Sequence, residues 1–159
     1  MYPSALESTP ASTSLTNALI VSTVHLNIGS NTGDRLALIE RAIVLIGEYA
    51  GEVTARSRAV ESSPWGFESP HPFMNVGINI ETELEPLALL DRLQSIEREV
   101  SPIPHRNPDG SYRDRGIDID IIAWNGLTMK TDRLSIPHPL AREREFVMLP
   151  LREIWPHRF

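Results

Sequence analysis

The sequence predicts an α+β fold in which an antiparallel sheet carries two helices on one face. Two segments, 35–47 and 86–100, have apolar residues at spacings of three and four, which is typical of amphipathic helices. Other segments alternate apolar and polar residues, which is the period of a half-buried strand. The clearest of these is 117–121, where isoleucines alternate with aspartates.

The first half of the chain is predicted to contain one helix and three strands. Strand 24–28 is followed by a turn rich in small and polar residues, and Asp34 is a candidate N-cap for helix 35–47. The turn could bind phosphate through its backbone amides, but it lacks the Gly-x-x-x-x-Gly-Lys-Ser/Thr pattern, so a plain turn is favoured. Strands are predicted over 51–61 and 73–82, separated by a proline-rich loop of the kind that often carries binding residues.

The second half adds a helix, the isoleucine–aspartate strand and a short C-terminal helix. Pro86 suits the first turn of helix 86–100, and a polar loop over 101–114 leads to the strand. An Asn-Gly pair at 125–126 predicts a hairpin turn, and 146–154 is predicted to be a short helix. The resulting order is that of a ferredoxin-like βαββαβ sheet with a hairpin and a short helix added. Both long helices on one face would leave the other face free for the loops and the aspartates.

The composition is that of an ordinary globular domain. Hydrophobic residues make up 41% of the 159 residues and charged residues 23%, and we expect one domain over 24–159 behind a flexible tail over 1–23. The net charge of −6 and a pI of about 5.3 disfavour a nucleic-acid-binding surface. The chain has no cysteine, which excludes disulfides and cysteine-based zinc sites and suits a reducing cytoplasm. No apolar run is long enough to span a membrane, and we expect a monomer.

Asp118 and Asp120 are the strongest candidates for a functional pair. On a strand they share one face, with Cα atoms roughly 6.7 Å apart, and two carboxylates that close repel each other. Arg113 and Arg115 could supply part of the compensating charge, and one or two divalent metal ions could supply the rest. The alternative is a surface strand whose acids are simply solvated.

Other polar residues remain open to two interpretations when each is considered alone. Asn75 could read a ligand in a pocket or be a satisfied core asparagine. Gln94 and Glu97 lie one turn apart and so share a helix face, which could be no more than a solvated face. His138 alone is weak evidence for a binding site. Together with the arginines that follow it, such as Arg144, it would form a positively charged side of the site.

Several motifs occur together in a fixed order. They are Ile28-Gly29-Ser30-Asn31, Pro64-Trp65-Gly66, Phe73-Met74-Asn75, the pair Gln94 and Glu97, Arg115-Gly116-Ile117-Asp118-Ile119-Asp120-Ile121, Ile136-Pro137-His138-Pro139 and Arg144-Glu145-Phe146-Val147-Met148-Leu149-Pro150-Leu151. Over about 24–154 the chain thereby resembles the 6-hydroxymethyl-7,8-dihydropterin pyrophosphokinase family of the folate pathway. The ordered set is far more specific than any single motif.

The resemblance implies a reaction and a set of site residues. The family transfers a diphosphate from ATP, its co-substrate, to the pterin hydroxymethyl group, with two Mg²⁺ ions, and releases AMP. By resemblance Asp118 and Asp120 hold both metal ions and act in catalysis with Arg113 and Arg115. The implied ATP-binding residues are Gln94, Glu97, Arg115, Ile121, Arg133, Ser135, His138 and Arg144. The implied pterin-binding residues are Ser62, Ser63, Trp65, Phe73, Asn75 and Phe146, with the two phenylalanines stacking on the ring.

The loop before the aspartates departs from the family pattern. Many members carry Arg-Trp-Gly-Pro-Arg there, whereas this chain keeps only the last arginine, Arg115, and has Ser111 at the first arginine position. Arg113 or Arg106 could take over that phosphate contact, and Tyr112 could replace the tryptophan. An aromatic residue often follows the histidine in the family, and here it is a proline.

Two other functions compete with this interpretation. A nucleic-acid-binding module can be built on the same sheet, but the chain lacks an aromatic strand motif for it and is acidic. A two-metal phosphohydrolase would use the same aspartates and would release phosphate without a pterin acceptor.

Overall fold

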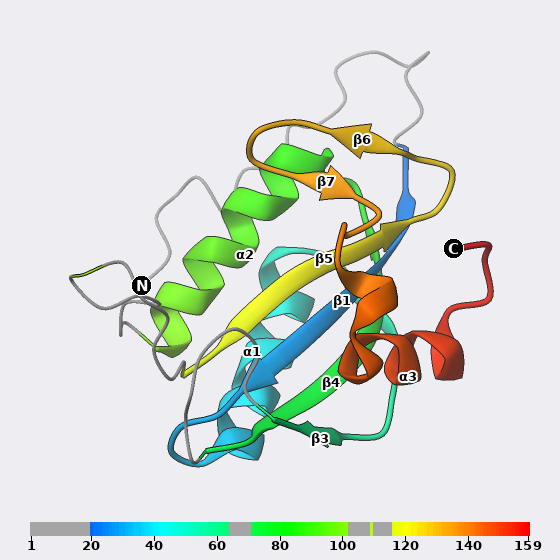
Figure 1. Ribbon diagram of the computed structural model, residues 1–159. Helices are drawn as coiled ribbons and strands as arrows, with labels where there is room; N and C mark the ends of the chain where they lie inside the picture. The colour runs from blue at the N-terminus through cyan, green and yellow to red at the C-terminus, as the bar shows by residue number, and fades with distance from the viewer. Residues whose placement is uncertain (1–19, 64–70, 102–108, 110–115) are drawn as a thin grey trace.

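An antiparallel sheet is the centre of the molecule in the computed structural model, which describes residues 20–63, 71–101, 109 and 116–159 (Figure 1). The elements are β1 (Ser22–Ser30), α1 (Arg35–Tyr49), β2 (Glu52–Arg56), β3 (Val60–Ser62), β4 (Phe73–Thr82), α2 (Pro86–Val100), β5 (Asp118–Trp124), β6 (Met129–Lys130), β7 (Ser135–Ile136), the 3₁₀ helix η2 (Ala141–Glu143) and α3 (Glu145–Ile154). The sheet order is β2-β4-β1-β5, and β3 also pairs with β4. This confirms the ferredoxin-like α+β fold.

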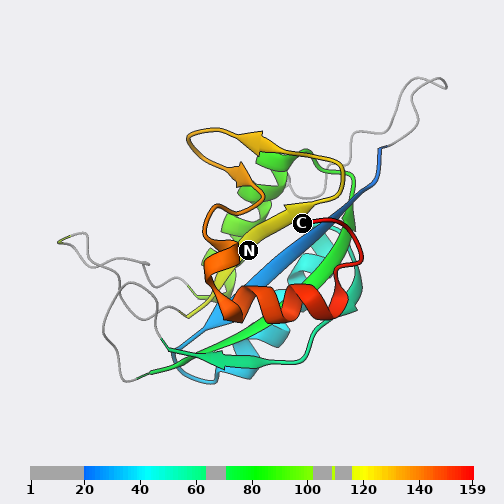
Figure 2. The same ribbon diagram turned by 45° about the vertical axis from the view of Figure 1, so that its right-hand side comes forward.

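Helices α1 and α2 cover one face of the sheet, and α3 lies on the other face (Figure 2). The core between the sheet and the two long helices is apolar, and alternate strand residues such as Leu26, Ile78 and Ile119 point into it. The face predicted to be free for loops and aspartates is therefore partly covered. The short α3 packs there against Ile122 and Ala123 of β5, because Val147 and Leu151 give it a narrow apolar stripe.

Local sequence explains the ends of the first two helices. The Asp34 side chain accepts a hydrogen bond from the Ala37 amide at 3.1 Å and so caps α1, as predicted. Pro86 stands in the first turn of α2. Helix α1 runs two residues beyond the predicted stop at Gly47, because this glycine is accommodated inside the helix.

Two predicted elements differ in detail. The strand predicted over 51–61 is interrupted into β2 and β3, where Ser57 turns its hydroxyl to the amide of Gly77. The Asn125–Gly126 turn forms, with Gly126 at φ +78°, but the strand after it pairs with β7 and not with β5. The hairpin is therefore β6–β7.

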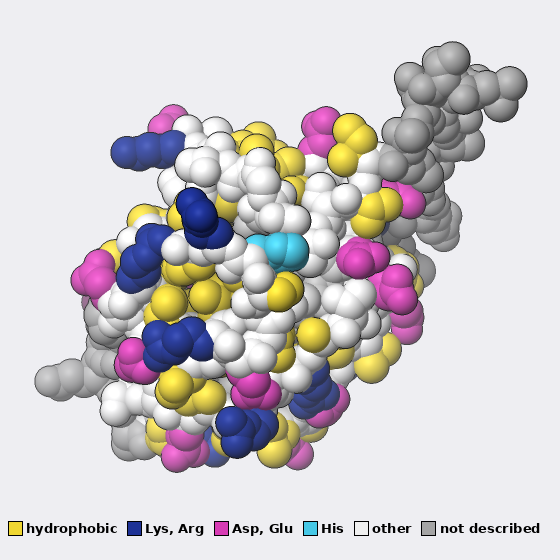
Figure 3. Space-filling model, turned by 90° about the vertical axis from the view of Figure 1, so that its right-hand side faces the viewer, with side chains coloured by type: hydrophobic (Ala, Val, Ile, Leu, Met, Phe, Trp, Pro, Cys, Tyr) yellow, Lys and Arg dark blue, Asp and Glu magenta, His cyan; other side chains and the backbone are white. Residues whose placement is uncertain are grey.

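The start of the sheet lies inside the segment that was expected to be a tail, because β1 begins at Ser22. Residues 1–19 lie outside the described part of the chain. Within the described residues, no helix combines the length and the apolar character that crossing a bilayer requires. The face that carries the C-terminal residues mixes basic, acidic and apolar side chains (Figure 3).

Candidate active site

Strand β5 presents Asp118 and Asp120 on the face opposite the two long helices. Both residues are half-buried, whereas Ile119 between them is buried in the core. In the register of the sheet, Asp118 lies opposite Gly29 and Asp120 opposite Asn27 of β1. Because Asn75 of β4 lies opposite Gly29 on its other side, Asp118, Gly29 and Asn75 form one row across three strands.

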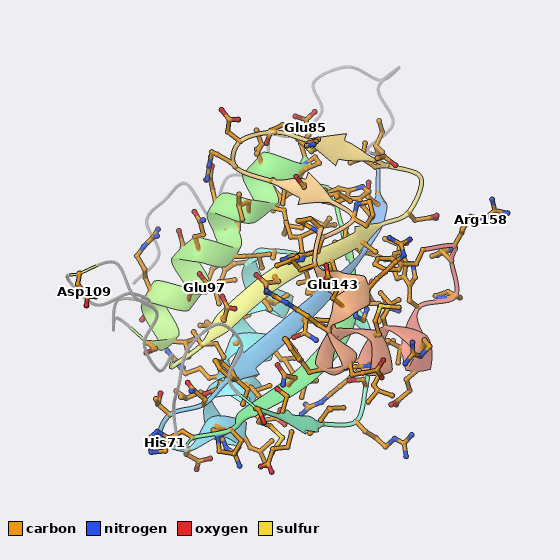
Figure 4. All side chains as sticks on the ribbon, viewed as in Figure 1. His71, Glu85, Glu97, Asp109, Glu143 and Arg158 are labelled. Atoms are coloured by element: carbon orange, nitrogen blue, oxygen red, sulfur yellow. The ribbon has the colours of Figure 1, made fainter. Side chains whose placement is uncertain are left out.

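Glu97 lies beneath this row, between α2 and β5 (Figure 4). It is 9% exposed, and its Oε2 accepts a hydrogen bond from the backbone amide of Ile119 at 2.7 Å. Burial, together with the nearby charge of Asp118 and then that of Asp120, raises the pKa of Glu97 to about 9. The Glu97 carboxyl therefore carries a proton near neutral pH, beside the two aspartates of β5.

A second group of predicted residues gathers at the β3–β4 pair. Ser62 pairs with Phe73 in the register, and the Asn75 amide nitrogen donates to the Ser62 hydroxyl at 2.9 Å and to the Val60 carbonyl at 3.2 Å. These bonds fix the amide and leave its oxygen over β1. A Cβ on Gly29 would lie 2.9 Å from that oxygen and 3.5 Å from Cδ1 of Phe73. The absence of a side chain at Gly29 therefore makes room for both residues.

Phe146 reaches the same region from α3. Its carbonyl oxygen accepts a hydrogen bond from the Asn27 side-chain amide at 3.1 Å, and the Arg144 guanidinium lies 5.7 Å from its ring centroid. Asn27 is the sheet neighbour of Asp120. The structure thus brings Phe73, Asn75 and Phe146 to adjacent positions along β1, next to the aspartates.

His138 and Arg144 border the aspartates on the other side. Burial lowers the pKa of His138, the Arg144 charge lowers it further and the Asp118 charge raises it, so His138 lies within the field of both groups. The Leu140 amide donates to Nδ1 of His138 at 3.2 Å. The neutral imidazole therefore carries its proton on Nε2, which is the tautomer that can donate to an anionic ligand.

The remaining predicted ATP-binding residues lie at the surface of α2, in β7 and in the core. Arg133 contacts Gln94 Oε1 at 3.4 Å and Asp91 at 2.7 Å, so two of the predicted ATP-binding residues, Arg133 and Gln94, lie together on the surface of α2. Ser135 is half-buried in β7. The Ile121 side chain is 3% exposed and belongs to the core, so it can meet a nucleotide only through its backbone.

The described part of the chain does not include every predicted site residue. Ser63 is described and exposed, whereas Trp65, Arg113 and Arg115 lie outside the described residues. The same holds for the loop residues Arg106 and Ser111.

Arg35 and Asn27 were missed by the sequence prediction. Arg35 Nη1 donates to the Pro72 carbonyl at 2.9 Å and lies 3.0 Å from Glu61 Oε2, so it holds β3 to the start of β4. It also borders a pocket of about 240 Å³ lined by Asn31, Thr32, Gly33, Arg35, His71 and Pro72. The alternation of polar residues in β1 was a usable signal for Asn27, because His25, Asn27 and Gly29 interrupt the apolar set with a period of two.

The sheet order and the carboxylates on β5 define a ferredoxin-like α+β domain in which two aspartates lie beside Asn75, Phe73 and Phe146. The chain belongs to the 7,8-dihydro-6-hydroxymethylpterin-pyrophosphokinase (HPPK) family, whose profile matches residues 25–156. This confirms the family resemblance found in the sequence.

Curated relatives carry the same family name. The 2-amino-4-hydroxy-6-hydroxymethyldihydropteridine pyrophosphokinase of Porphyromonas gingivalis is 40% identical over 134 residues, which cover 84% of this chain and 90% of that protein. The enzymes of that name from Aquifex aeolicus and Bacillus subtilis are each 36% identical, over 86% and 82% of this chain and 82% and 76% of their own length.

Solved structures share the fold at low identity. A Plasmodium falciparum HPPK-DHPS matches with a TM-score of 0.69 and 15% identity, covering 91% of this chain and 44% of that chain. An HPPK-DHPS in complex with substrates matches with a TM-score of 0.63 and 17% identity, over 85% and 40%. This chain therefore spans less than half of those longer chains.

Proposed function

We propose that this chain transfers the diphosphate of ATP to the hydroxymethyl group of 6-hydroxymethyl-7,8-dihydropterin and releases AMP, a reaction of folate biosynthesis. The observation that carries the proposal is the row formed by Asp118, Gly29 and Asn75, which joins a carboxylate site to an amide beside an aromatic ring. Neighbouring strands are about 4.8 Å apart, so Asn75 and Asp118 are separated by roughly 10 Å at the backbone. A pterin read by Asn75 at one end would extend its hydroxymethyl group toward the aspartates.

The donor set at β5 fits magnesium. Mg²⁺ is usually bound by one or two carboxylates together with substrate phosphates, and Asp118 and Asp120 offer two. Within the described ranges no group of three or more His, Asp or Glu side chains is arranged to hold a metal by itself, which is in keeping with a site that substrate phosphates complete. We assign two Mg²⁺ ions to Asp118 and Asp120; when bound, they would neutralise phosphate charge.

The protein groups supply binding and orientation. His138, through Nε2–H, and Arg144 are proposed to bind phosphate oxygens, and Arg133 with Gln94 to bind the nucleotide at α2. Arg113 and Arg115 are proposed to contribute further positive charge. Glu97 is proposed to act beneath the site, holding β5 through the Ile119 amide instead of touching ATP.

The pterin ring is proposed to lie between Phe73 and Phe146. The Phe73 ring lies 3.5 Å from the position that a Cβ on Gly29 would occupy, and the Phe146 backbone carbonyl is hydrogen-bonded to Asn27, two residues away on the same face of β1. The two phenylalanines therefore approach neighbouring positions of one strand. Asn75 is proposed to bind the ring edge, together with Ser62, Ser63 and Trp65.

In the reaction the pterin hydroxyl oxygen bonds to the β-phosphorus of ATP. The bond from that phosphorus to the oxygen bridging to the α-phosphate breaks, AMP leaves with that oxygen, and the hydroxyl proton is released. Asp118 is the nearest carboxylate proposed to receive this proton. Most of the rate would come from positioning and charge neutralisation, as for other phosphoryl transfers.

The test is AMP release from ATP and Mg²⁺ with and without hydroxymethyl-dihydropterin. The proposal expects AMP only when the pterin is present, with one pterin diphosphate formed for each AMP. Release of inorganic phosphate without pterin would identify a phosphohydrolase instead.

The site is also proposed to work within one chain in the cytoplasm and without a nucleic acid. The described site residues converge on one region of the chain. Light scattering after size-exclusion chromatography should give the mass of a monomer, 17.8 kDa.

A further inference from the structure

Helix α3 contains a proline in its interior, at Pro150. A proline has no backbone N–H, and its ring crowds the carbonyl of the residue four positions earlier. In α3 that residue is Phe146. The Phe146 carbonyl therefore loses its regular helical partner, although it lies inside the helix.

Asn27 of β1 supplies the missing donor. Its side-chain amide donates to the Phe146 carbonyl oxygen at 3.1 Å, and Asn27 itself is only 4% exposed. The proline is buried on the same face, because its Cβ lies 2.7 Å from the position that a Cβ on Gly77 would occupy. Gly77 is the register partner of Asn27. Pro150 thus leaves the Phe146 carbonyl without its helical N–H donor, and Asn27 donates the hydrogen bond in its place.

A second asparagine holds the other end of α3. The Asn79 amide donates to the Ile154 carbonyl at 2.7 Å, which is one of the last carbonyls of the helix and has no partner within it. Asn79 therefore fixes the end that is remote from Phe146. Asn27 fixes the half that carries Phe146 and lies beside Asp120 in the sheet.

We propose that Asn27 is a positioning residue for Phe146: it provides the hydrogen bond that Pro150 withholds and so sets where the Phe146 ring stands relative to the Asp120 strand. This rests on the proposed function, in which Phe146 stacks on the pterin. An asparagine suits the position because it donates a hydrogen bond without adding charge next to Asp120.

The test replaces Asn27 with an apolar side chain of similar shape, Asn27→Leu. The KM for hydroxymethyl-dihydropterin should rise about tenfold while the KM for ATP stays within twofold of the wild-type value. Adding Pro150→Ala should restore the pterin KM, because residue 150 then has an N–H for the Phe146 carbonyl. If Asn27 only stabilised the fold, giving residue 150 a backbone N–H would not restore the pterin KM.

Asn79→Leu is the matched control. It removes the same kind of amide-to-carbonyl bond at the far end of α3, together with the contact between Asn79 Oδ1 and His25, and should lower thermal stability without raising the pterin KM. A wild-type pterin KM in Asn27→Leu, an equal rise of both KM values, or no recovery with Pro150→Ala would overturn the inference. Absence of pterin-dependent AMP release by the wild-type chain would instead overturn the proposed function.

Discussion

The Glu97 carboxylate and the Ile119 backbone amide are joined by a hydrogen bond of 2.7 Å that runs from α2 to β5. Ile119 stands between the two aspartates, so this bond holds the strand segment that carries the proposed metal ligands against α2. A buried amide left without a partner costs about 1–3 kcal/mol. Below pH 4.5, where Glu97 is protonated in both the folded and the unfolded chain, Glu97→Leu should therefore lower the free energy of unfolding by about that amount, whereas Glu97→Gln keeps an acceptor and should lose less. Urea denaturation of both variants measures the difference, and equal losses would contradict the role of the bond.

The raised pKa of Glu97 predicts how stability depends on pH in the absence of metal. The pKa is 4.5 ordinarily and about 9 in the fold, so the folded chain binds a proton that the unfolded chain releases between these values. This contribution to stability is complete below pH 4.5 and is lost as the pH rises through about 9. Thermal melting in EDTA should show this fall in the wild type and a flatter profile in Glu97→Gln. A parallel decline in both proteins would argue against the assignment.

His25 predicts a dependence of opposite sign at lower pH. It is buried, its Nδ1 is 2.8 Å from Asn79 Oδ1, and burial lowers its pKa from 6.5 to about 4. Its contribution to stability is therefore present above pH 6.5 and is lost as the pH falls toward 4. At about 1.4 kcal/mol per unit this amounts to roughly 3 kcal/mol.

Denaturation of His25→Phe between pH 7 and 4 tests this expectation. The variant should lack that component of the acid dependence, whatever its stability at pH 7. His157→Gln, which removes an exposed histidine, should keep it. An unchanged acid profile in His25→Phe would count against the effect.

Gly29 is expected to be intolerant of a side chain because of Asn75. A Cβ there would lie 2.9 Å from the Asn75 amide oxygen, closer than such atoms pack. Gly29→Ala should displace the amide and raise the pterin KM by about tenfold or more, with little change in the ATP KM.

Gly47→Ala is the control for this substitution. It lies inside α1, and its nearest neighbour would be Val53 at 4.0 Å. Alanine is favoured over glycine in a helix by roughly 0.5–1 kcal/mol, so this variant should be somewhat more stable and fully active. A wild-type pterin KM in Gly29→Ala would show that the amide can move without consequence.

Arg35 is expected to support the pterin side of the site, because it holds Glu61 and the Pro72 carbonyl on the two strands that carry Ser62 and Phe73. Arg35→Ala should raise the pterin KM up to about tenfold, since a hydrogen bond from a charged donor contributes roughly 1.5–3 kcal/mol and this one is partly exposed. Arg41→Ala removes an exposed arginine of the same helix and should have no effect. A pterin KM that changes equally in both variants would remove Arg35 from the account.

The sequence predicted the fold well because its long periodic elements determine it. The alternation in β1, β4 and β5 showed which residues share a face, and the stripes of α1 and α2 showed what covers one of the two faces. The position of α3 was not predictable in the same way, because its short apolar stripe does not indicate which part of the sheet it packs against. The polar residues that hold it, Asn27 and Asn79, therefore had no assigned role.

Part of the candidate site was predictable because some of its residues lie in these periodic strands. Asp118, Asn75 and Phe73 lie in strands whose register follows from the fold, so their proximity could be anticipated. Glu97 shared a helix face with Gln94, and only the packing of α2 on β5 shows that Glu97 turns inward while Gln94 meets Arg133. Such differences depend on a few ångströms of packing, which residue spacing does not encode.

The proposed metal ligands should lower the stability of the metal-free protein at alkaline pH. Asp118 and Asp120 both oppose ionisation of Glu97, whose pKa is about 9 in the fold. Above about pH 9, Asp118→Asn or Asp120→Asn should therefore raise the melting temperature in EDTA by a few degrees, as about 1 kcal/mol does for a protein of this size. Glu48→Gln, which removes an exposed acid from α1, should leave it unchanged.

The central claim is that diphosphate transfer occurs at Asp118 and Asp120. Its most direct test is single-turnover formation of AMP and pterin diphosphate from ATP, Mg²⁺ and hydroxymethyl-dihydropterin by the wild type and the two Asn variants. The wild type should form both products in equal amounts. Each variant should form both at least about 10²-fold more slowly, the scale expected when one electrostatic stabiliser of a transition state is removed, while remaining folded. Near-wild-type product formation by either folded variant would contradict the account.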